Sequence, residues 1–317
     1  MKALVTGGAG FIGSTLVDRL LAEGHAVDVV DNLSSGSLTN LADARGDRSN
    51  DLTIHQIDIR DTTVAELIER RRPEVVFHLA AQIDVRVSVA NPVLDAEINV
   101  LGSINVLEGA RRAGTRKVVF ASSGGTIYGE PDPADLPVKE SHPQRPISPY
   151  GVAKKVVADY LHAYRELYQL EYTALALANV YGPRQDPHGE AGVVAIFAGR
   201  LLANESCTVF GEGDQTRDYV YVDDVVDAFV RAADRGTGLV INIGTGRETS
   251  VNQLYATMAR ASGVDLPTVQ APPRPGELAR CALDNGRAEL HLDWRPWTDL
   301  PTGAAAVLEH FRAENPV

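Results

Sequence analysis

The chain has 317 residues, of which 44% are hydrophobic and 23% charged, a composition typical of a folded globular protein. This length allows one large α/β unit or two tightly joined domains. The net charge of −12 argues against broad contact with nucleic acid or an anionic membrane. With only two cysteines and no Cys/His cluster at zinc spacing, the sequence predicts neither a disulfide framework nor a metal site.

No apolar run approaches the length of a membrane span, and the sequence starts with a strand pattern rather than a signal peptide. We therefore expect a cytoplasmic protein with no membrane partner. An anionic small molecule is still compatible with the negative net charge if its site gathers its own arginines.

The N-terminal segment has the pattern of a nucleotide-binding turn. Residues 2–6 are an apolar run that predicts a buried strand, Gly7, Gly10 and Gly13 follow, and a helical pattern begins at Ser14. Glycine lets the backbone approach a pyrophosphate, and a helix N-terminus offers N–H groups and a positive dipole end to the anion. A tight structural turn would show the same triplet, so the glycines alone are weak evidence.

A second predicted strand, residues 26–30, strengthens this interpretation. It ends in Asp31, eighteen residues after Gly13. An acid at this distance is placed to bind the ribose hydroxyls of an adenosine, so we predict dinucleotide binding. Asp31 followed by Asn32 favours NAD over NADP, because a carboxylate would repel a 2′-phosphate.

Strand and helix patterns alternate through the first half of the chain, which predicts a parallel sheet covered on both faces. We divide the chain into a Rossmann-type, doubly wound dinucleotide-binding domain, residues 1–178, and a smaller mixed α/β substrate-binding region, residues 179–317. A strand near 239–243 could rejoin the main sheet. Further strands are expected at 52–57, 74–79, 117–121 and 172–178, and helices at 64–72, 95–113 and 150–168.

Tyr150 and Lys154 form a Tyr-x-x-x-Lys pattern at the start of a predicted helix, so both side chains lie on one face. A free tyrosine has a pKa of about 10, too high for a base at neutral pH. A neighbouring ammonium and a positively charged nicotinamide would lower that pKa. The pattern alone is more often surface helix. Its position after a glycine turn and a Ser122-Ser123 strand end favours a catalytic pair.

Together these motifs resemble the extended short-chain dehydrogenases/reductases, specifically the nucleotide-sugar epimerases of the bacterial UDP-glucose 4-epimerase type. The resemblance covers nearly the whole chain. The stretches that carry it are residues 6–13, 58–59, 78–82, Asn99, 122–129, Tyr150 with Lys154, 179–184, 211–224 and 274–277.

The resemblance implies an NAD-dependent UDP-hexose 4-epimerase. Tyr150 would take the proton of the sugar 4-hydroxyl while hydride passes to tightly bound NAD and later returns to the other face of the 4-keto sugar. Lys154 would hold the nicotinamide ribose and tune Tyr150. The cofactor residues would be Gly7, Gly10, Phe11, Ile12, Gly13, Asp31, Asn32, Ser35, Gly36, Asp58, Ile59, Leu79, Ala80, Ala81, Gln82, Asn99 and Ser122.

The UDP-sugar would lie in the second half of the chain. Arg217 and Arg274 suit a diphosphate because guanidinium groups pair with phosphate oxygens. Structural alternatives are that Asn99 caps a helix, that Val209-Phe210 is core, and that the two arginines are surface charges. The implied substrate residues are Asn179, Val193, Val209, Phe210, Arg217, Arg274, Glu277 and Cys281.

Two positions bear on the substrate. Gly124 stands where the family usually has a Ser or Thr that hydrogen-bonds the sugar 4-oxygen, so Ser122, Ser123 or Thr126 must replace it, with Ser123 and Thr126 as our candidates. No acidic pair follows Gly124, which argues against the water elimination of 4,6-dehydratases. Cys281 occupies the place that faces the sugar 2-substituent in similar epimerases, where a thiol would leave room for an N-acetyl group; the alternative is a buried structural cysteine.

Two other functions stay open. One is a different NAD-dependent UDP-sugar enzyme, such as a decarboxylase or a reductase that releases NADH. The other is a non-catalytic dinucleotide sensor, which the presence of both Tyr150 and Lys154 disfavours. We also expect a homodimer, because helices matching 95–113 and 150–168 pair across a two-fold axis in similar epimerases.

Overall fold

The computed structural model describes residues 1–187, 192–273 and 278–314. Its centre is a seven-stranded parallel sheet of strand order β11-β6-β5-β4-β1-β2-β3. The order reverses between β1 and β4, and ligands of open α/β sheets bind at such a switch point. The predicted doubly wound sheet is therefore confirmed. The strands are β1 (Lys2–Thr6), β2 (Ala26–Asp31), β3 (Leu52–Gln56), β4 (Val75–His78), β5 (Lys117–Ser123), β6 (Glu171–Leu177) and β11 (Leu239–Ile243).

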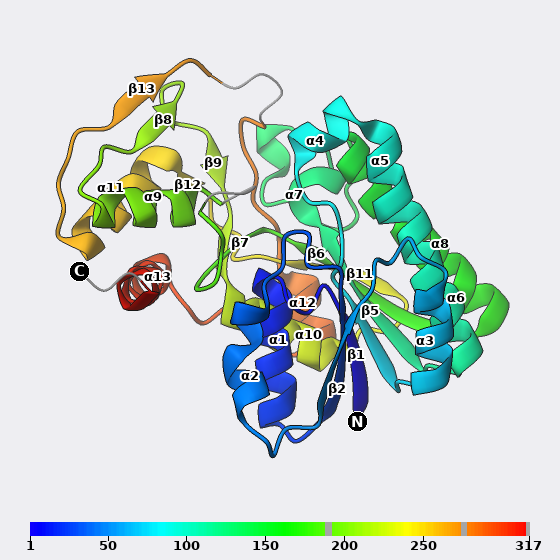
Figure 1. Cartoon of the computed structure of the whole chain (residues 1–317). Helices are drawn as coiled ribbons and strands as arrows, with labels where there is room; N and C mark the ends of the chain where they lie inside the picture. Colours follow the sequence, from blue (N-terminus) through cyan, green and yellow to red (C-terminus); the bar gives the residue numbers. More distant parts are fainter. Residues whose placement is uncertain (188–191, 274–277, 315–317) are drawn as a thin grey trace.

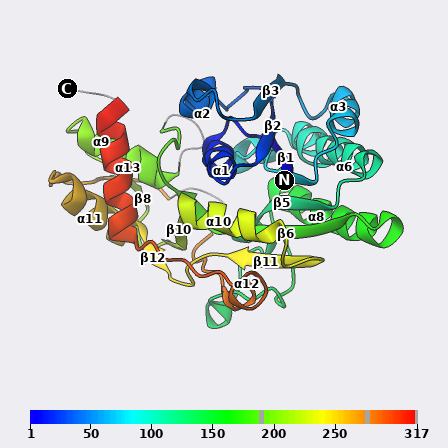
Figure 2. The ribbon, with the colours of Figure 1, turned by 90° about the horizontal axis from the view of Figure 1, so that it is seen from below.

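Helices cover both faces of the sheet (Figure 1), and the view from below separates the two layers (Figure 2). Alternate strand residues face opposite layers: Val5 and Phe77 belong to one core, Leu4 and Val76 to the other. Both faces are thus apolar, as parallel strands require. One layer holds α1 (Phe11–Ala22) and α10 (Val222–Ala232), with α12 (Gly286–Leu292) beside α10 and β11; the other holds α3 (Thr63–Arg71), α6 (Gly102–Ala113) and α8 (Pro149–Tyr168).

The helix expected at 95–113 differs from the structure in two respects. It begins earlier, at α5 (Pro92–Ala96), where the Asn91 side chain accepts a hydrogen bond from the Leu94 N–H. A π-helical turn, η2 (Glu97–Leu101), then precedes α6. π-Helical turns are rare in proteins overall, but those that occur are often at functional sites. This one contains Asn99.

Several short elements were not expected from the sequence. They lie in the connections, where few apolar residues recur at helical spacing. They are η1 (Leu38–Leu41), α2 (Ala42–Gly46), α4 (Val85–Ala90), α7 (Gly124–Ile127) and η3 (Pro133–Asp135).

The second half of the chain builds a smaller region beside the carboxyl ends of the main strands, at the upper left of Figure 1. Its helices α9 (Val193–Leu202), α11 (Val251–Ser262) and α13 (Leu300–Glu314) pack on one another. β11 leaves this region and pairs in parallel with β6 at the edge of the main sheet. The described residues of this region also form three two-stranded sheets: β7 (Asn179–Tyr181) with β10 (Tyr219–Tyr221), β8 (Thr208–Phe210) with β13 (Val269–Ala271), and β9 (Thr216–Arg217) with β12 (Thr249–Ser250).

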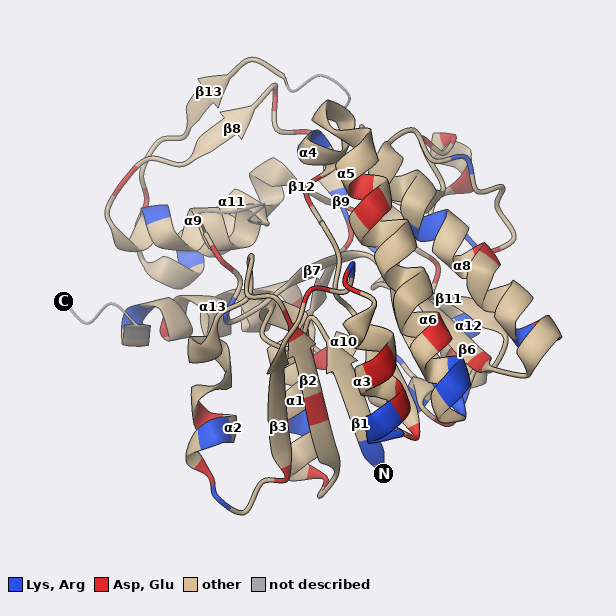
Figure 3. Ribbon diagram, turned by 45° about the vertical axis from the view of Figure 1, so that its right-hand side comes forward, with Lys and Arg blue, Asp and Glu red and all other residues tan. Residues whose placement is uncertain are grey.

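Charged residues lie mainly on helices and loops, and the strands of the main sheet carry few of them (Figure 3). On α6, for example, Arg111 pairs with Glu108 at 2.8 Å on the helix surface. In the described part of the chain, no helix combines the length and the apolar character that crossing a membrane requires.

Candidate active site

The glycine turn between β1 and α1 leaves no room for side chains. Gly7 has φ +70°, and a Cβ there would lie 2.7 Å from the Ala80 nitrogen. A Cβ on Gly13 would lie 2.0 Å from the Gly7 carbonyl oxygen. Gly10 is the N-cap of α1 and gives it no side-chain cap, so the helix starts at Phe11 and Ile12 with its N–H groups directed at the turn. This geometry suits a phosphate.

Asp31, at the end of β2, holds this turn. Its buried carboxylate accepts hydrogen bonds from the Ala9 N–H at 2.9 Å and the Leu33 N–H at 2.8 Å. A Cβ on Gly36 would lie 3.0 Å from both Asp31 oxygens, so the loop that carries the exposed Ser35 passes close to the carboxylate. The acid found from its spacing therefore also organises the backbone around it.

The predicted adenine end lies beside Asp31. The Asn32 amide donates to Asp58 at 2.9 Å, and the Arg60 guanidinium holds the pKa of Asp58 well below its usual range. Ile59 is buried and packs on Gly102 of α6, where a Cβ would lie 2.8 Å from the Ile59 side chain. These contacts bring together segments that the sequence separates by more than twenty residues.

A buried chain of hydrogen bonds links the ends of β1 and β4. The Ser103 hydroxyl donates to the Asn99 carbonyl at 2.6 Å, so it accepts from His78 Nε2 at 2.8 Å. His78 Nδ1 then accepts from the Thr6 hydroxyl at 2.7 Å, and Thr6 in turn accepts from the Leu79 and Ala80 N–H groups at 3.2 Å. Burial, together with the nearby Lys154 charge, lowers the pKa of His78 to about 3, so the imidazole is neutral.

Asn99, on the π-helical turn, clamps the segment that follows Ala81. Its side-chain oxygen accepts from the Gln82 N–H at 2.8 Å, and its amide donates to the Gln82 carbonyl at 2.9 Å. The same amide donates to the buried Asp95 carboxylate at 2.9 Å, and the Gln82 side-chain amide donates to that oxygen at 3.0 Å. Asn99 is therefore more than a helix cap: it fixes the predicted path to the nicotinamide.

Tyr150 and Lys154 lie on α8 as the spacing predicts, and the Ser148 hydroxyl caps this helix by accepting from the Gly151 N–H at 3.2 Å. The Lys154 ammonium is buried, donates to the Ala121 carbonyl at 2.8 Å, and lies 5.6 Å from the centre of the Tyr150 ring. Burial lowers the pKa of Lys154 to about 8.

The expected lowering of the Tyr150 pKa depends on the Lys154 ammonium together with the nicotinamide charge. Among the protein groups alone, burial raises the pKa of Tyr150 well above its usual range. Of the groups that act on Tyr150, the Ser123 hydroxyl, which hydrogen-bonds the phenol, favours the ionised form, and Asp95 opposes it. The protein residues alone thus keep this phenol protonated at neutral pH.

The strand end around Gly124 explains the departure from the family pattern. A Cβ on Gly124 would lie 2.3 Å from a Leu283 methyl and 3.1 Å from the Ala176 carbonyl oxygen, so Leu283 occupies the place of a side chain. Ser123 reaches Tyr150, whereas Thr126 donates to the Ser123 carbonyl at 3.4 Å. The Ser122 hydroxyl is buried without a hydrogen-bond partner among the described residues.

The structure brings together only some of the residues that are predicted to bind the UDP-sugar. Asn179 is exposed at the start of β7, and its side-chain oxygen lies 4.0 Å from a Cβ built on Gly125. Val193 is the first residue of α9, Phe210 is half-buried at the end of β8, and Val209 is a core side chain.

Arg217 and Cys281 complete the part of this set that the structure describes. The Arg217 guanidinium donates to the Thr216 carbonyl at 2.7 Å. Cys281 is buried, and burial raises the pKa of its thiol to about 11. Arg274 and Glu277 lie outside the described residues.

Sequence reasoning missed the roles of three residues of the site: Asp95, and Thr6 and Ser103, the polar partners of His78. Asp95 is four residues before Asn99 in an otherwise apolar helix pattern, which places both on one face and was an available signal. The contacts of His78 with Thr6 and Ser103 join distant segments and leave no local pattern. Within residues 1–187, 192–273 and 278–314, no group of His, Cys, Asp and Glu could hold a metal ion.

Comparison with known proteins gives close relatives along the whole chain. UDP-glucose 4-epimerase of Mycolicibacterium smegmatis is 52% identical over 98% of this chain and 99% of that protein. A crystal structure of UDP-glucose 4-epimerase with UDP-glucose from Thermotoga maritima has 46% identity and a TM-score of 0.95, with 99% of each chain covered. That of the Thermus thermophilus UDP-glucose 4-epimerase complex with NAD has 43% identity and a TM-score of 0.91, with 100% of each chain covered.

The match to a protein family agrees with the fold and with the arrangement of the glycine turn and the tyrosine–lysine pair. Residues 3–244 match the NAD dependent epimerase/dehydratase family, and this range includes the main sheet except for Lys2, the first residue of β1. This chain belongs to the NAD dependent epimerase/dehydratase family.

Proposed function

We propose that the protein is a UDP-glucose 4-epimerase that interconverts UDP-glucose and UDP-galactose. The observation that carries the proposal is the group Ser123, Tyr150 and Lys154 at the carboxyl edge of the sheet, next to a glycine turn shaped for a phosphate. The full-length similarity to three proteins that bear this name supports it.

The residues around the turn fit NAD. A Cβ would collide with backbone at both Gly7 and Gly13, so the turn is preserved for close approach of a ligand. Asp31 lies where a ribose would bind, and no basic side chain hydrogen-bonds it in the described part of the chain, which disfavours a 2′-phosphate. Bound NAD would supply the hydride acceptor and donor for sugar C4. Extraction of the cofactor from purified protein should yield NAD, and recovery of mainly NADP would contradict the assignment.

The protein residues then have separate tasks. Tyr150 takes the proton of the 4-hydroxyl and returns it after the ketone has turned over. The Ser123 hydroxyl favours the ionised phenol, and the Lys154 ammonium adds positive charge on the same helix face. Ser123 is preferred to Thr126 for the missing family hydroxyl because only Ser123 hydrogen-bonds Tyr150 among the described contacts of the two.

The charge and size of the side chains assign residues to the parts of the UDP-sugar. Arg217 and Arg274 bind the diphosphate of UDP, which fixes the nucleotide. Gly125 adds no side chain at the sugar end, where a Cβ would meet only the Asn179 side-chain oxygen at 4.0 Å, so the hexose has room to turn over between the two transfers. Asn179, Val193 and Phe210 line the uridine end in this assignment.

One assay tests the proposal against its rivals. Purified protein is incubated with UDP-galactose, while UDP-glucose is followed by chromatography and NADH by absorbance. Net formation of UDP-glucose without free NADH supports an epimerase. Stoichiometric NADH would indicate a reductase-type enzyme, and no turnover by NAD-loaded protein would indicate a sensor; either outcome overturns the proposal.

We further propose a cytoplasmic homodimer. Large apolar side chains stay exposed along α5, η2 and α8, namely those of Val93, Leu101, Val152 and Tyr160. Exposed apolar surface of this kind often marks a subunit interface. Light scattering at micromolar concentration should give twice the monomer mass of 34.0 kDa; the monomer mass itself would contradict the dimer.

A further inference from the structure

We propose that Asp95 is a positioning residue for the Tyr150–Lys154 pair: its buried carboxylate holds the Gln82 and Asn99 side chains and supplies a negative charge on α5, opposite α8. This inference rests on the proposed function, because it concerns the same proton-transfer pair. It assigns a task to a carboxylate that takes no part in the steps derived above.

The first support is geometric. Asp95 is 1% exposed, and one of its oxygens accepts from both the Gln82 amide and the Asn99 amide. Asn99 binds the backbone of Gln82 at both its N–H and its carbonyl, so the three residues form one closed unit. A buried carboxylate with amide donors but no cation within salt-bridge distance among the described residues is costly to keep, which argues for a task beyond packing.

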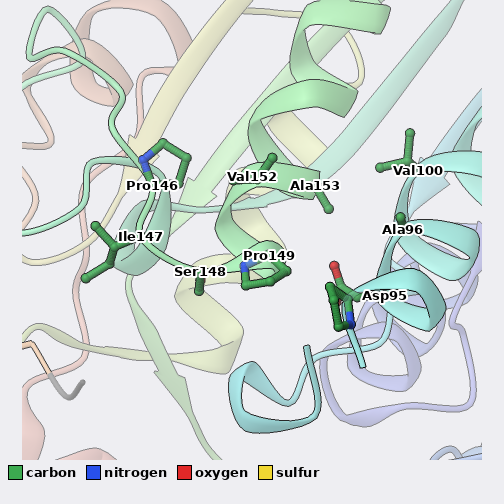
Figure 4. A pocket seen from close by; sticks show the side chains of 10 residues that line it. Asp95, Ala96, Val100, Pro146, Ile147, Ser148, Pro149, Val152 and Ala153 are labelled. Atoms are coloured by element: carbon green, nitrogen blue, oxygen red, sulfur yellow. The ribbon is translucent and has the colours of Figure 1, made fainter. Parts of the chain in front are cut away.

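The second support is the position of Asp95 relative to α8. It lines a cavity of about 520 Å³ between α5 and the start of α8, with Ser148, Pro149, Val152 and Ala153 on the other wall. Figure 4 shows Asp95 on α5 close to Pro149, one residue before Tyr150. Among the described residues, no hydrogen bond or ion pair joins the carboxylate to Tyr150 or Lys154, yet its charge acts on both through the low-dielectric interior.

The third support is the sign of this action. Asp95 raises the pKa of both Tyr150 and Lys154, whereas burial raises the first and lowers the second. Asp95 thus keeps Lys154 charged and delays ionisation of Tyr150.

Among the residues that the structure describes, the other ionisable groups around the pair give no comparable negative charge. On β4 the neutral His78 faces Lys154, and at the start of α4 Asp84 pairs with Arg86 at 3.3 Å. On η2, Glu97 is exposed and acts on Arg60. The pH dependence of the pair is therefore expected to follow Asp95.

Asp95→Asn tests the charge because the amide oxygen can still accept both hydrogen bonds. Both limbs of the pH profile of kcat/KM should move to lower pH, by half a unit or more, since Tyr150 ionises more easily and Lys154 loses its proton sooner. Asp227→Asn, a buried carboxylate on α10 in the opposite layer, is the matched control and should leave both limbs in place. A lower rate with unmoved limbs would show a merely structural role and would overturn the inference.

A second readout does not depend on activity. The chain has five lysines, so NMR of ¹³Cε-labelled lysine resolves Lys154, assigned with Lys154→Arg. Its pKa should fall in Asp95→Asn relative to the wild type and stay unchanged in Asp227→Asn; no fall would overturn the inference. If Asp95→Asn does not fold, Asp95→Ser gives the same comparison. Failure of the proposed function would appear instead as no epimerisation by the wild type, with the NMR shift intact.

Discussion

The carboxyl edge of the sheet carries two functional ends that are built from different material. The glycine end, between β1 and β2, is formed mainly by backbone: Gly7 and Gly13 leave room for a ligand, and Asp31 accepts hydrogen bonds from two N–H groups. The tyrosine end, beside β4 and β5, is formed by buried ionisable side chains, and the charge of Asp95 acts on Tyr150 and Lys154.

Because of this difference, the two ends should tolerate different kinds of amino-acid substitution. A backbone-built site fails when an atom is added, because the colliding partner is main chain that cannot rotate away. A site of buried ionisable groups fails when an atom or a charge is removed, because the remaining groups then hold the wrong proton. The two ends therefore make opposite predictions for substitution.

The largest expected effect is at the tyrosine end. Tyr150→Phe removes one oxygen, so the fold and the bound NAD should persist while turnover falls by about 10²–10⁴-fold, the usual share of a general acid–base group. Turnover of UDP-galactose measures the loss. Tyr160→Phe, an exposed tyrosine on the same helix, is the control. Turnover of Tyr150→Phe within tenfold of wild type would remove Tyr150 from the mechanism.

The next largest effect is expected at the glycine end, where adding one methyl group should disrupt the turn. Gly13→Ala places a Cβ 2.0 Å from the Gly7 carbonyl oxygen, so we expect a loss of about 1–3 kcal/mol in stability, typical of overpacking, together with loss of bound NAD. Gly46→Ala, where a Cβ meets nothing within 4 Å, is the matched control. Urea denaturation and the cofactor content of purified protein measure both losses. A Gly13→Ala variant that keeps NAD and wild-type stability would show that the turn is not tightly packed.

The same contrast explains what the sequence could predict. The glycine end lies within one β–α–β unit, so strand, glycine spacing and Asp31 are all visible locally. Tyr150 and Lys154 are visible too, because four residues on a helix define one face. The strands of the main sheet follow from their apolar runs, within two residues at each end.

The sequence predicted only some of the residues at the tyrosine end, because the others come from distant segments that meet only in the folded protein. Ser123 could not be distinguished from Thr126 until both side chains were placed, and Leu283 covers Gly124 from more than 150 residues away. The lowering of the Tyr150 pKa was expected from two nearby positive charges, the Lys154 ammonium and the nicotinamide. Burial opposes it, and burial is a property of the packed molecule.

The third prediction concerns the pH dependence of stability that is due to His78, the neutral histidine that lies between the two ends. The pKa of His78 is lowered from an ordinary 6.5 to about 3 in the folded protein, so between these values the unfolded chain binds the proton and the folded one does not. This contribution to stability is present above pH 6.5 and is lost as the pH falls, by at most about 1.4 kcal/mol per pH unit. Urea denaturation at pH 7, 6 and 5 should show a steeper loss for wild type than for His78→Asn. The surface variant His162→Asn is the control, and equal slopes for wild type and His78→Asn would show that His78 is not held neutral.

The smallest expected effect is at the sugar side of the tyrosine end, where the smaller region contributes Leu283 over Gly124 and, two residues earlier, Cys281. If this buried thiol leaves the space that an N-acetyl group needs, the enzyme should accept UDP-N-acetylglucosamine besides UDP-glucose. Cys281→Tyr fills that space, so kcat/KM for the N-acetylated pair should fall about tenfold or more relative to the plain hexoses, the usual scale of steric discrimination in a pocket. Cys281→Ser keeps the residue small and should preserve the ratio. Melting temperatures identify any variant whose core is disturbed. An equal fall for both substrate pairs in a folded Cys281→Tyr would show that Cys281 does not gate the sugar 2-position.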